Sequence, residues 1–425
     1  MSKIHSTTLG YYNPAFFHLN ISTNISFHEF SDKDYSVFVH EYIHFLQDVT
    51  TYYGLNNMFV YSEYLRFATN KIYKSINPHF KVPIIPFSDN EQNVFLNKQI
   101  SKLTNGDSYE IKTIKSIDSI DIVKEETGVS GTKFDEIDSA IITCKNEKEE
   151  EFILIFGAIC IKENMAYLME QFICEKYEKS PDFPYSIAEK VAENIYPEFA
   201  YNKLNILALC DVSLQYSNPG PVFIHFLKEY KSLVWLPSKP EDIYDNAFDR
   251  PNILNEVSLT LIESSYNKLA ITVKKQLTGY FNDPEIFSNL IIWLDELIET
   301  AKELRFINKY FILNMARNGK HEFDNIFKKI GTPLISNDIG ECTLLYPSKP
   351  EEGVEIGYFY AIGQIIDLFE SGNPECKMKK ICKTQKNETD SRCNNEPWAR
   401  CFDEIKCPYA LLWNHWKLSS YVPFL

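Results

Sequence analysis

Apolar residues recur at helical spacing over most of this chain and alternate at strand spacing only in short runs. Two β-prone runs come first, at about 15–21 and 24–30. Residues 31–34, with the sequence Ser-Asp-Lys-Asp, have the form of a capping box at the start of a helix. We therefore expect one helix over 35–53 and a second helix over 56–75.

The rest of the chain is also mostly helical in its pattern. Short β-type runs fill about 108–146, and a second apolar run at 152–156 leads into another long helix. The further helical segments are expected at 157–176, at 185–276 with breaks at 219–221 and at about 237–251, at 283–314 and at 353–370. The fold class that this pattern predicts is α+β with a helical majority.

Composition and charge narrow the function classes. The chain has 425 residues, of which 44% are hydrophobic, so we expect a folded protein with a substantial core. Its formal net charge of −15 argues against nucleic-acid binding, which needs clustered Lys and Arg, and against a membrane partner. No apolar stretch is long enough to cross a bilayer, and the first residues lack a signal-peptide pattern. We therefore expect a cytoplasmic protein.

The clearest chemical signal is the segment His40-Glu41-Tyr42-Ile43-His44, inside the first expected helix. Residues four apart lie on one face of a helix, so the imidazoles of His40 and His44 can point at one ion. The carboxylate of Glu41 lies beside the first histidine, where it can act as a base toward water. Because the flanking residues are apolar, these polar groups should be buried, which is costly unless they bind a cation.

This H-E-x-x-H pattern resembles the zincin metallopeptidases. The metzincin branch continues as H-E-x-x-H-x-x-G-x-x-H. Here Gln47 and Thr50 stand at the last two of those positions, which excludes that branch.

The gluzincin branch takes its third ligand from a glutamate on a later helix, and Glu163 resembles that ligand. Glu170, two turns further along the same stripe, is the alternative. The small residues Gly157, Ala158 and Ala166 lie near Glu163, and they would let two helices approach closely. The resemblance therefore implies a zincin-like core with an active-site helix and a small sheet.

The resemblance also implies a mechanism. One Zn²⁺ ion would be held by His40, His44 and Glu163, with water in the fourth position. Glu41 would take a proton from that water as it attacks a peptide carbonyl, and would pass the proton to the leaving nitrogen.

Further residues are expected around such a site. Tyr167 and His225 are candidates for a donor that stabilises the oxyanion. Asp48 and Asp211 are candidates for the carboxylates that orient ligating histidines. Asp48 is equally well explained as a solvated charge on the helix surface. Asp211 lies within the apolar run 207–214, which is a poor place for an unpaired charge.

The last part of the chain holds five of the ten cysteines and three of the five tryptophans. These cysteines are Cys376, Cys382, Cys393, Cys401 and Cys407. Three interpretations stay open: buried free thiols, a structural zinc ion bound by four of the thiols, and disulfides in an oxidising compartment. No C-x-x-C pair occurs among them, which weakens the interpretation as a zinc site.

These observations predict a zinc-dependent metallopeptidase that acts on a specific protein target, as a regulatory, toxin-like or defence protease does. The alternatives are a zincin-like module that binds a partner without catalysis, and an amide deacylase. We expect a peptide or protein substrate, and a regulatory protein partner is compatible with the length of the chain. The expected parts are a metal-binding core over 1–180 with an insertion at about 78–150, a helical region over 181–371, and a Cys- and Trp-rich tail over 372–425.

Overall fold

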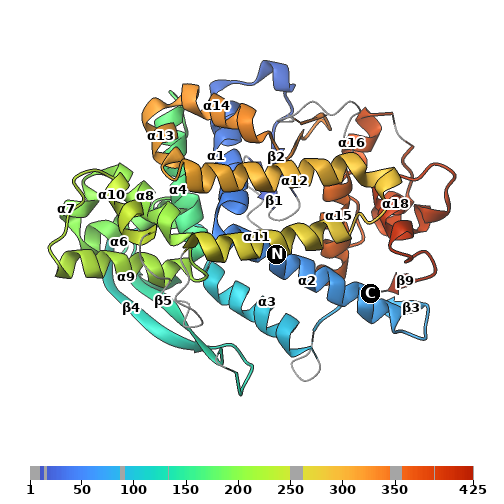
Figure 1. The fold of residues 1–425 in the computed structure, drawn as a ribbon, viewed down its shortest axis with the longest axis horizontal. Coiled ribbons are helices and arrows are strands. Elements are labelled where there is room, and N and C mark those ends of the chain that lie inside the picture. Colours follow the sequence, from blue (N-terminus) through green and yellow to red (C-terminus); the bar gives the residue numbers. More distant parts are fainter. Residues whose placement is uncertain are drawn as a thin grey trace.

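The computed structural model describes residues 10–13, 17–86, 91–132, 134–248, 262–344, 357–386 and 388–424. This part of the chain is α+β and mostly helical, as the sequence pattern predicts (Figure 1). The predicted positions 15–16, 249–261 and 353–356 lie outside the described residues.

The first part of the chain combines long helices with short strands. Its helices are α1 (Asp32–Thr50), α2 (Tyr52–Tyr73), α3 (Gln92–Asn105) and α4 (Ala158–Ile173), with a 3₁₀ helix η1 (Phe27–Glu29) before α1. Its strands are β1 (Gly10–Asn13), β2 (His18–Ile21), β3 (His79–Lys81), β4 (Ser116–Glu126), β5 (Glu136–Lys145) and β6 (Glu151–Ile155). In Figure 1 the long hairpin of β4 and β5 extends from the lower side of the molecule.

The second part is almost entirely helical within the described residues. Short and medium helices come first: α5 (Asp182–Tyr185), α6 (Ile187–Ile195), α7 (Pro197–Ala200), α8 (Lys203–Ser213), α9 (Pro219–Ser232) and α10 (Glu241–Phe248). Next are α11 (Ile262–Gly279), α12 (Pro284–Ile307), α13 (Phe311–Asn318), α14 (Lys320–Ile330) and α15 (Gly357–Ser371), with β7 (Leu334–Asn337) and β8 (Cys342–Thr343) before α15. The tail holds α16 (Lys379–Thr384), α17 (Arg392–Asn395), the 3₁₀ helix η2 (Pro397–Phe402), α18 (Pro408–His415) and β9 (Val422–Phe424).

The strand predicted over 24–30 is wrong, because this segment forms η1 instead. The Glu341 carboxylate accepts the backbone N–H of Phe27 at 3.0 Å, and the Asn337 amide donates to the carbonyl of Ile25 at 3.1 Å. These side chains, which are distant in sequence, bind backbone groups that a strand would pair with a neighbouring strand.

The first long helix ends earlier than the predicted position 53. The Thr51 hydroxyl accepts the backbone N–H of Gly54, so Thr51 caps a new helix, α2, instead of continuing α1. A Cβ atom on Gly54 would lie 2.3 Å from the backbone of Asp48. Only glycine therefore allows α2 to begin this close to the end of α1.

Segments far apart in the sequence pair with one another in the sheets. One sheet has the order β1-β2-β7-β8, in which β2 runs parallel to β7 with His18 opposite Leu334. A second pair joins β3 to β9, also in parallel, with Phe80 opposite Pro423. The hairpin of β4 and β5 continues into β6 as a separate antiparallel sheet.

The helix that carries the histidine motif lies in the interior. Buried apolar side chains of the described residues form one connected core, and every residue of α1 from Val39 to Thr50 is buried. α4 packs along α1, as the small residues near Glu163 predict. Gly157 instead lets the start of α4 lie close to the end of α3, because a Cβ atom there would lie 2.4 Å from the carbonyl oxygen of Asn105.

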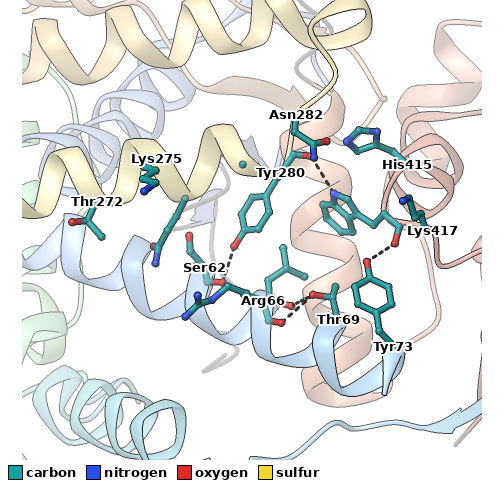
Figure 2. A pocket seen from close by; sticks show the side chains of 14 residues that line it. Ser62, Arg66, Thr69, Tyr73, Thr272, Lys275, Tyr280, Asn282, His415 and Lys417 are labelled. Carbon is teal, nitrogen blue, oxygen red and sulfur yellow. Dashed lines mark hydrogen bonds between the residues drawn. The ribbon is translucent and has the colours of Figure 1, made fainter. Parts of the chain in front are cut away.

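A pocket of about 670 Å³ lies apart from α1 and α4. Figure 2 shows it between α2, the end of α11 and the segment that follows α18, with Tyr280 near its centre. None of the helices in the described residues is both long enough and apolar enough to cross a membrane.

Candidate metal centre

The candidate metal centre is built on α1, whose start is fixed by a capping box. The Ser31 hydroxyl accepts the backbone N–H of Asp34, and the Asp34 carboxylate accepts the backbone N–H of Ser31. His40 and His44 lie on one face of this helix, and their ring centroids are 5.0 Å apart. The local sequence therefore sets the spacing of the two imidazoles before any tertiary contact is considered.

Glu163 of α4 completes a group of three. Its Oε2 atom lies 3.1 Å from Nε2 of His40 and 3.4 Å from Nε2 of His44. Their potential ligand atoms all lie within 4.8 Å of one another, and all three residues are buried. Tetrahedral ligands at about 2.1 Å from a zinc ion are about 3.4 Å from one another, so these separations suit one ion.

The second nitrogen of each imidazole also has a partner. Nδ1 of His40 lies 3.4 Å from Oε2 of Glu170, and Nδ1 of His44 lies 2.8 Å from Oε1 of Gln47. Acceptor oxygens at Nδ1 favour the tautomer that carries its proton there and leaves the Nε2 lone pair available to a metal. Glu170, the alternative third ligand, thus lies on the opposite side of the His40 ring from Glu163.

The carboxylates make this region favourable for positive charge. Burial by itself lowers the pKa of His40, but its hydrogen bonds with Glu163 and Glu170 outweigh burial and raise the pKa to about 10. Burial by itself raises the pKa of Glu163, but the adjacent His44 and His40 lower that pKa well below its usual range. A positive charge on or between the two imidazoles is therefore stabilised.

A polar clamp joins α1 to α4 next to the three ligands. Lys162 Nζ donates to Oδ1 of Asp48 at 2.8 Å, and the side chain of Asp48 is fully buried. Gln47 Nε2 donates to the backbone carbonyl of Lys162 at 3.0 Å. Asp48 therefore holds α4, the helix that carries Glu163, against α1. The carboxylate that contacts Nδ1 of His40 is that of Glu170.

Glu41 and Tyr185 are further side chains of this region. Glu41 directly follows His40 and is buried, at 8% exposure. The ring of Tyr185, at the end of α5, lies 5.8 Å from the ring of His40. Burial first, and then the charges of Glu163, Glu110 and Glu41, raise the pKa of Tyr185 well above its usual value. The sequence analysis missed Tyr185, because a four-residue helix carries no periodic signal.

Tyr167 and His225, the two expected donors, have other partners. The Tyr167 hydroxyl accepts the backbone N–H of Ser180 at 3.4 Å, and its ring lies 6.3 Å from that of Tyr185. His225 is exposed on α9, and its ring nitrogen lies 3.7 Å from the carboxylate of Glu229. The structure thus places Tyr185, rather than either predicted donor, against the ring of His40.

Asp211 does not contact His40 or His44; its hydrogen-bond partners lie elsewhere. Both of its carboxylate oxygens accept hydrogen bonds from Arg305, each at 2.8 Å, and Oδ2 also accepts the hydroxyl of Tyr244 at 2.7 Å. The Asp211 and Arg305 side chains are fully buried. Arg305, which lies on α12, is thus the partner that this buried carboxylate needs.

The cysteines of the tail do not form a second metal-binding group. The described ranges include all five of these cysteines. Within these ranges, the one group of three or more potential ligands whose atoms all lie within 4.8 Å of one another is that of His40, His44 and Glu163. Burial first, and then the neighbouring thiols of Cys407, Cys382 and Cys393, raise the pKa of Cys376 to about 12. The structure joins none of the ten cysteines of the chain, Cys401 included, in a disulfide, which agrees with the free-thiol interpretation among the three that the sequence leaves open.

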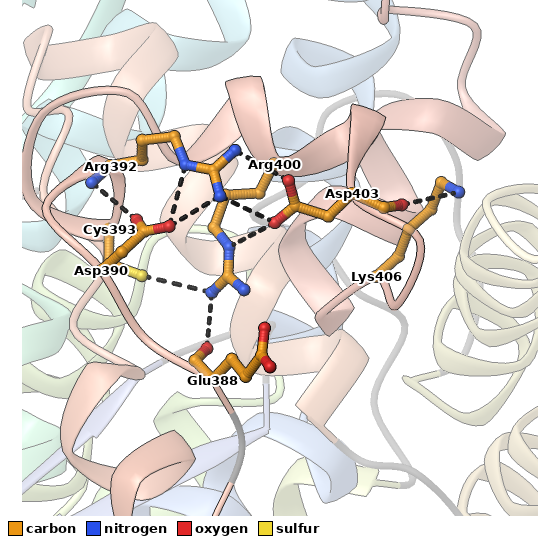
Figure 3. A network of polar contacts seen from close by, with 7 residues as sticks. All are labelled: Glu388, Asp390, Arg392, Cys393, Arg400, Asp403 and Lys406. Carbon is orange, nitrogen blue, oxygen red and sulfur yellow. Dashed lines mark hydrogen bonds and ion pairs between the residues drawn. The ribbon is translucent and has the colours of Figure 1, made fainter.

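An arginine–aspartate network connects this part of the tail (Figure 3). Arg400 donates to Sγ of Cys393 at 3.4 Å and to the carbonyl of Glu388 at 2.8 Å. Asp403 accepts from Arg400 at 3.1 Å and from Arg392 at 2.7 Å. The guanidinium group of Arg400 thus places a positive charge beside the Cys393 thiol.

The donor set at α1 and α4 fits a divalent cation. Two imidazole nitrogens and one carboxylate oxygen are the protein ligands of many catalytic zinc sites, and they leave one position for water. No protein-family model matches this sequence, and no curated protein or solved structure matches it either. The support for a metal centre therefore comes from the geometry of the chain itself.

Proposed function

We propose that the protein is a zinc-dependent hydrolase that cleaves peptide bonds, with its metal at His40, His44 and Glu163. The observation that carries this proposal is the convergence of these three buried side chains, with ligand atoms within 4.8 Å. Glu41, next to the first ligand, supplies the base that such a hydrolase needs. A purely structural zinc site is normally closed by a fourth protein ligand, whereas this group of three leaves a position open.

Each residue of the centre has a role in the proposed reaction. Zinc bound there would polarise the scissile carbonyl and lower the pKa of a bound water to about 7. Glu41 takes the proton of the attacking water and gives it to the leaving nitrogen. Glu170 and Gln47 hold the two imidazoles in the orientation that presents Nε2. Tyr185 is the candidate donor to the oxyanion, because its ring lies against His40.

We infer that the substrate is a particular protein rather than peptides in general. The ligands and the base are all buried, so a substrate has to be admitted selectively. A large part of the chain beyond α4 contributes none of the three ligands, and it is available for recognition.

Metal analysis tests the first half of the proposal. The full-length chain, purified without chelators, should contain about one zinc ion per molecule by plasma mass spectrometry. Glu41→Gln should keep this content, because Glu41 is not a ligand. Glu163→Gln should weaken zinc affinity by at least about tenfold, in the range known for disturbed metal sites. A metal-free wild type, or equal zinc affinity in Glu163→Gln, would contradict the assignment.

Comparison of wild type with Glu41→Gln tests the second half. Cells that express either form are analysed by mass spectrometry of newly formed protein N-termini, with Glu175→Gln as an exposed control. We expect new N-termini with wild type and with the control only, because loss of a general base costs about 10²–10⁴ in rate. If zinc is bound but wild type and Glu41→Gln give identical N-termini, the peptidase proposal is wrong and a binding module is favoured.

A further inference from the structure

The pocket between α2, α11 and the segment after α18 has a cationic lining. Arg66, Lys275 and Lys417 carry formal positive charge there, His415 adds an imidazole, and none of the lining residues is Asp or Glu. This contrasts with the net charge of −15 of the chain. Arg66 is paired with Glu63, which lies outside the lining, whereas Lys275 and Lys417 form no ion pair with the described residues. An anionic ligand would therefore be attracted to this pocket.

The pocket also presents aromatic surfaces that are held in place by hydrogen bonds. The Tyr280 hydroxyl donates to the carbonyl of Ser62 at 2.7 Å, and the Trp416 indole donates to the carbonyl of Tyr280 at 3.1 Å. The Tyr73 hydroxyl donates to the carbonyl of Trp416 on the other side (Figure 2). Rings with fixed positions provide flat surfaces for stacking at little entropic cost.

The end of α18 fixes the backbone of Lys417. Lys417 follows the cap residue of α18 and has φ 54°, in the left-handed region that glycine adopts most readily. Its N–H donates to the carbonyl of Asn414 at 2.8 Å, so the conformation belongs to the helix end. From this position the side chain of Lys417 lines the pocket.

From this combination we propose that the pocket binds a phosphorylated aromatic molecule of nucleotide size. A volume of about 670 Å³ is much larger than an inorganic phosphate ion requires and lies in the range of small-ligand pockets. The aromatic part stacks against Tyr280, and the phosphate is bound at one end of the pocket, by Lys275 with Arg66 or by Lys417. No lining residue comes from α1 or α4, so this site is distinct from the metal centre and does not depend on the proposed hydrolase activity.

Gly279 provides a way to block the pocket without disturbing the fold. It lines the pocket at the end of α11, and a Cβ atom added there would meet no atom within 4 Å. Gly279→Leu therefore fills part of the space that the ligand would use. Lys268→Gln is the matched charge control, because Lys268 is exposed on the same helix but does not line the pocket.

Isothermal titration calorimetry on the full chain with AMP, ATP and GTP, in the presence of a chelator, tests the proposal. At least one nucleotide should bind with a dissociation constant below about 1 mM. Adenosine and inorganic phosphate should each bind at least about tenfold more weakly than that nucleotide. The double variant Lys275→Gln/Lys417→Gln and the variant Gly279→Leu should each lose at least about tenfold in affinity, and Lys268→Gln should stay within about twofold.

Three results would overturn the assignment. The first is the absence of binding by all three nucleotides up to about 1 mM. The second is equal affinity for phosphate or adenosine alone, which would remove the need for one of the two parts of the ligand. The third is nucleotide binding that neither the double lysine variant nor Gly279→Leu weakens while circular dichroism shows them folded, since the ligand would then bind elsewhere.

Discussion

His18 is a histidine that the fold keeps in its neutral form. It is fully buried on β2, its ring stacks on Tyr360 with 3.8 Å between centroids, and its Nε2 lies 2.8 Å from the hydroxyl oxygen of Ser336. Burial, with a smaller effect from Lys377, lowers its pKa to about 3. In the unfolded chain the same group binds a proton below about pH 6.5, so the two states differ in charge between these values.

Stability should therefore fall as the pH is lowered from about 6.5 toward 3, because the unfolded state gains a proton that the folded state does not. His18 alone contributes a slope of about 1.4 kcal/mol per pH unit between about pH 5.5 and 4. We expect His18→Asn to lose this contribution, so its free energy of unfolding declines less steeply with acidification. Urea denaturation at several pH values measures the slopes, with exposed His79→Asn as a control. If the free energy of unfolding of His18→Asn declined with pH as steeply as that of wild type, His18 would not be the source of this pH dependence.

At the scale of elements, the clamp between Asp48 and Lys162 joins α1, which carries His40 and His44, to α4, which carries Glu163. Its lysine is 12% exposed and its aspartate is fully buried, with Oδ2 lacking a hydrogen-bond partner. The pair lies one residue before Glu163 on α4 and four residues after His44 on α1. A change in this pair should therefore affect both stability and the approach of Glu163 to the histidines.

Removal of one partner should be more harmful than removal of both. In the presence of a metal chelator, we expect Lys162→Met to lower the free energy of unfolding by about 3–5 kcal/mol, because it leaves the buried charge of Asp48 unpaired. The double variant Lys162→Met/Asp48→Asn should regain most of that loss. The control is Lys176→Met, which breaks an exposed ion pair with Asp32 at the start of α1 and should change little. Urea denaturation measures all four proteins, and a double variant no more stable than Lys162→Met would refute the explanation.

The parts of this centre that the sequence predicts are those that depend on local spacing. The capping box and the apolar run define α1, and the interval between His40 and His44 places both imidazoles on one face. The same reasoning could have found Gln47, three residues after His44, because that interval also brings side chains together on a helix.

Contacts between distant segments explain what the sequence analysis missed. The strand expected over 24–30 is replaced by η1 because Glu341 binds the backbone of Phe27, 314 positions away in sequence. The proximity of Tyr185 to His40 likewise depends on how the chain returns after α4. Hydrophobic periodicity reports neither relation, since it describes only which face of an element is buried.

At the scale of the whole molecule, Arg305 joins three helices in the interior. It binds both carboxylate oxygens of Asp211 on α8, and its Nε donates to the carbonyl of Thr50, at the end of α1, at 2.7 Å. The guanidinium also lies 4.9 Å from the ring centroid of Phe311. One buried cation thus connects the end of the motif helix to α8 and α12.

Arg305→Lys should be damaging although it keeps the charge. An ammonium group cannot reproduce the planar, bidentate contact with Asp211 together with the bond to Thr50. We expect a loss of about 2–4 kcal/mol in the free energy of unfolding, somewhat less than the loss of about 3–5 kcal/mol for removal of one partner of a buried pair, because lysine keeps the charge. Arg317→Lys, at the more exposed ion pair with Glu241, should cost less than about 1 kcal/mol. Differential scanning calorimetry compares the variants, and equal losses for both would contradict this role of Arg305.

The pairing of β2 with β7 has a consequence for how the protein reaches its native state. His18 meets Leu334 only after more than three hundred intervening residues have been synthesised, and α1 packs against this same sheet. Such a high contact order slows folding and leaves a nascent chain with an unpaired strand edge for a long time. The sheet against which α1 packs is therefore completed late, so chaperones that shield the growing chain should raise the yield of folded protein.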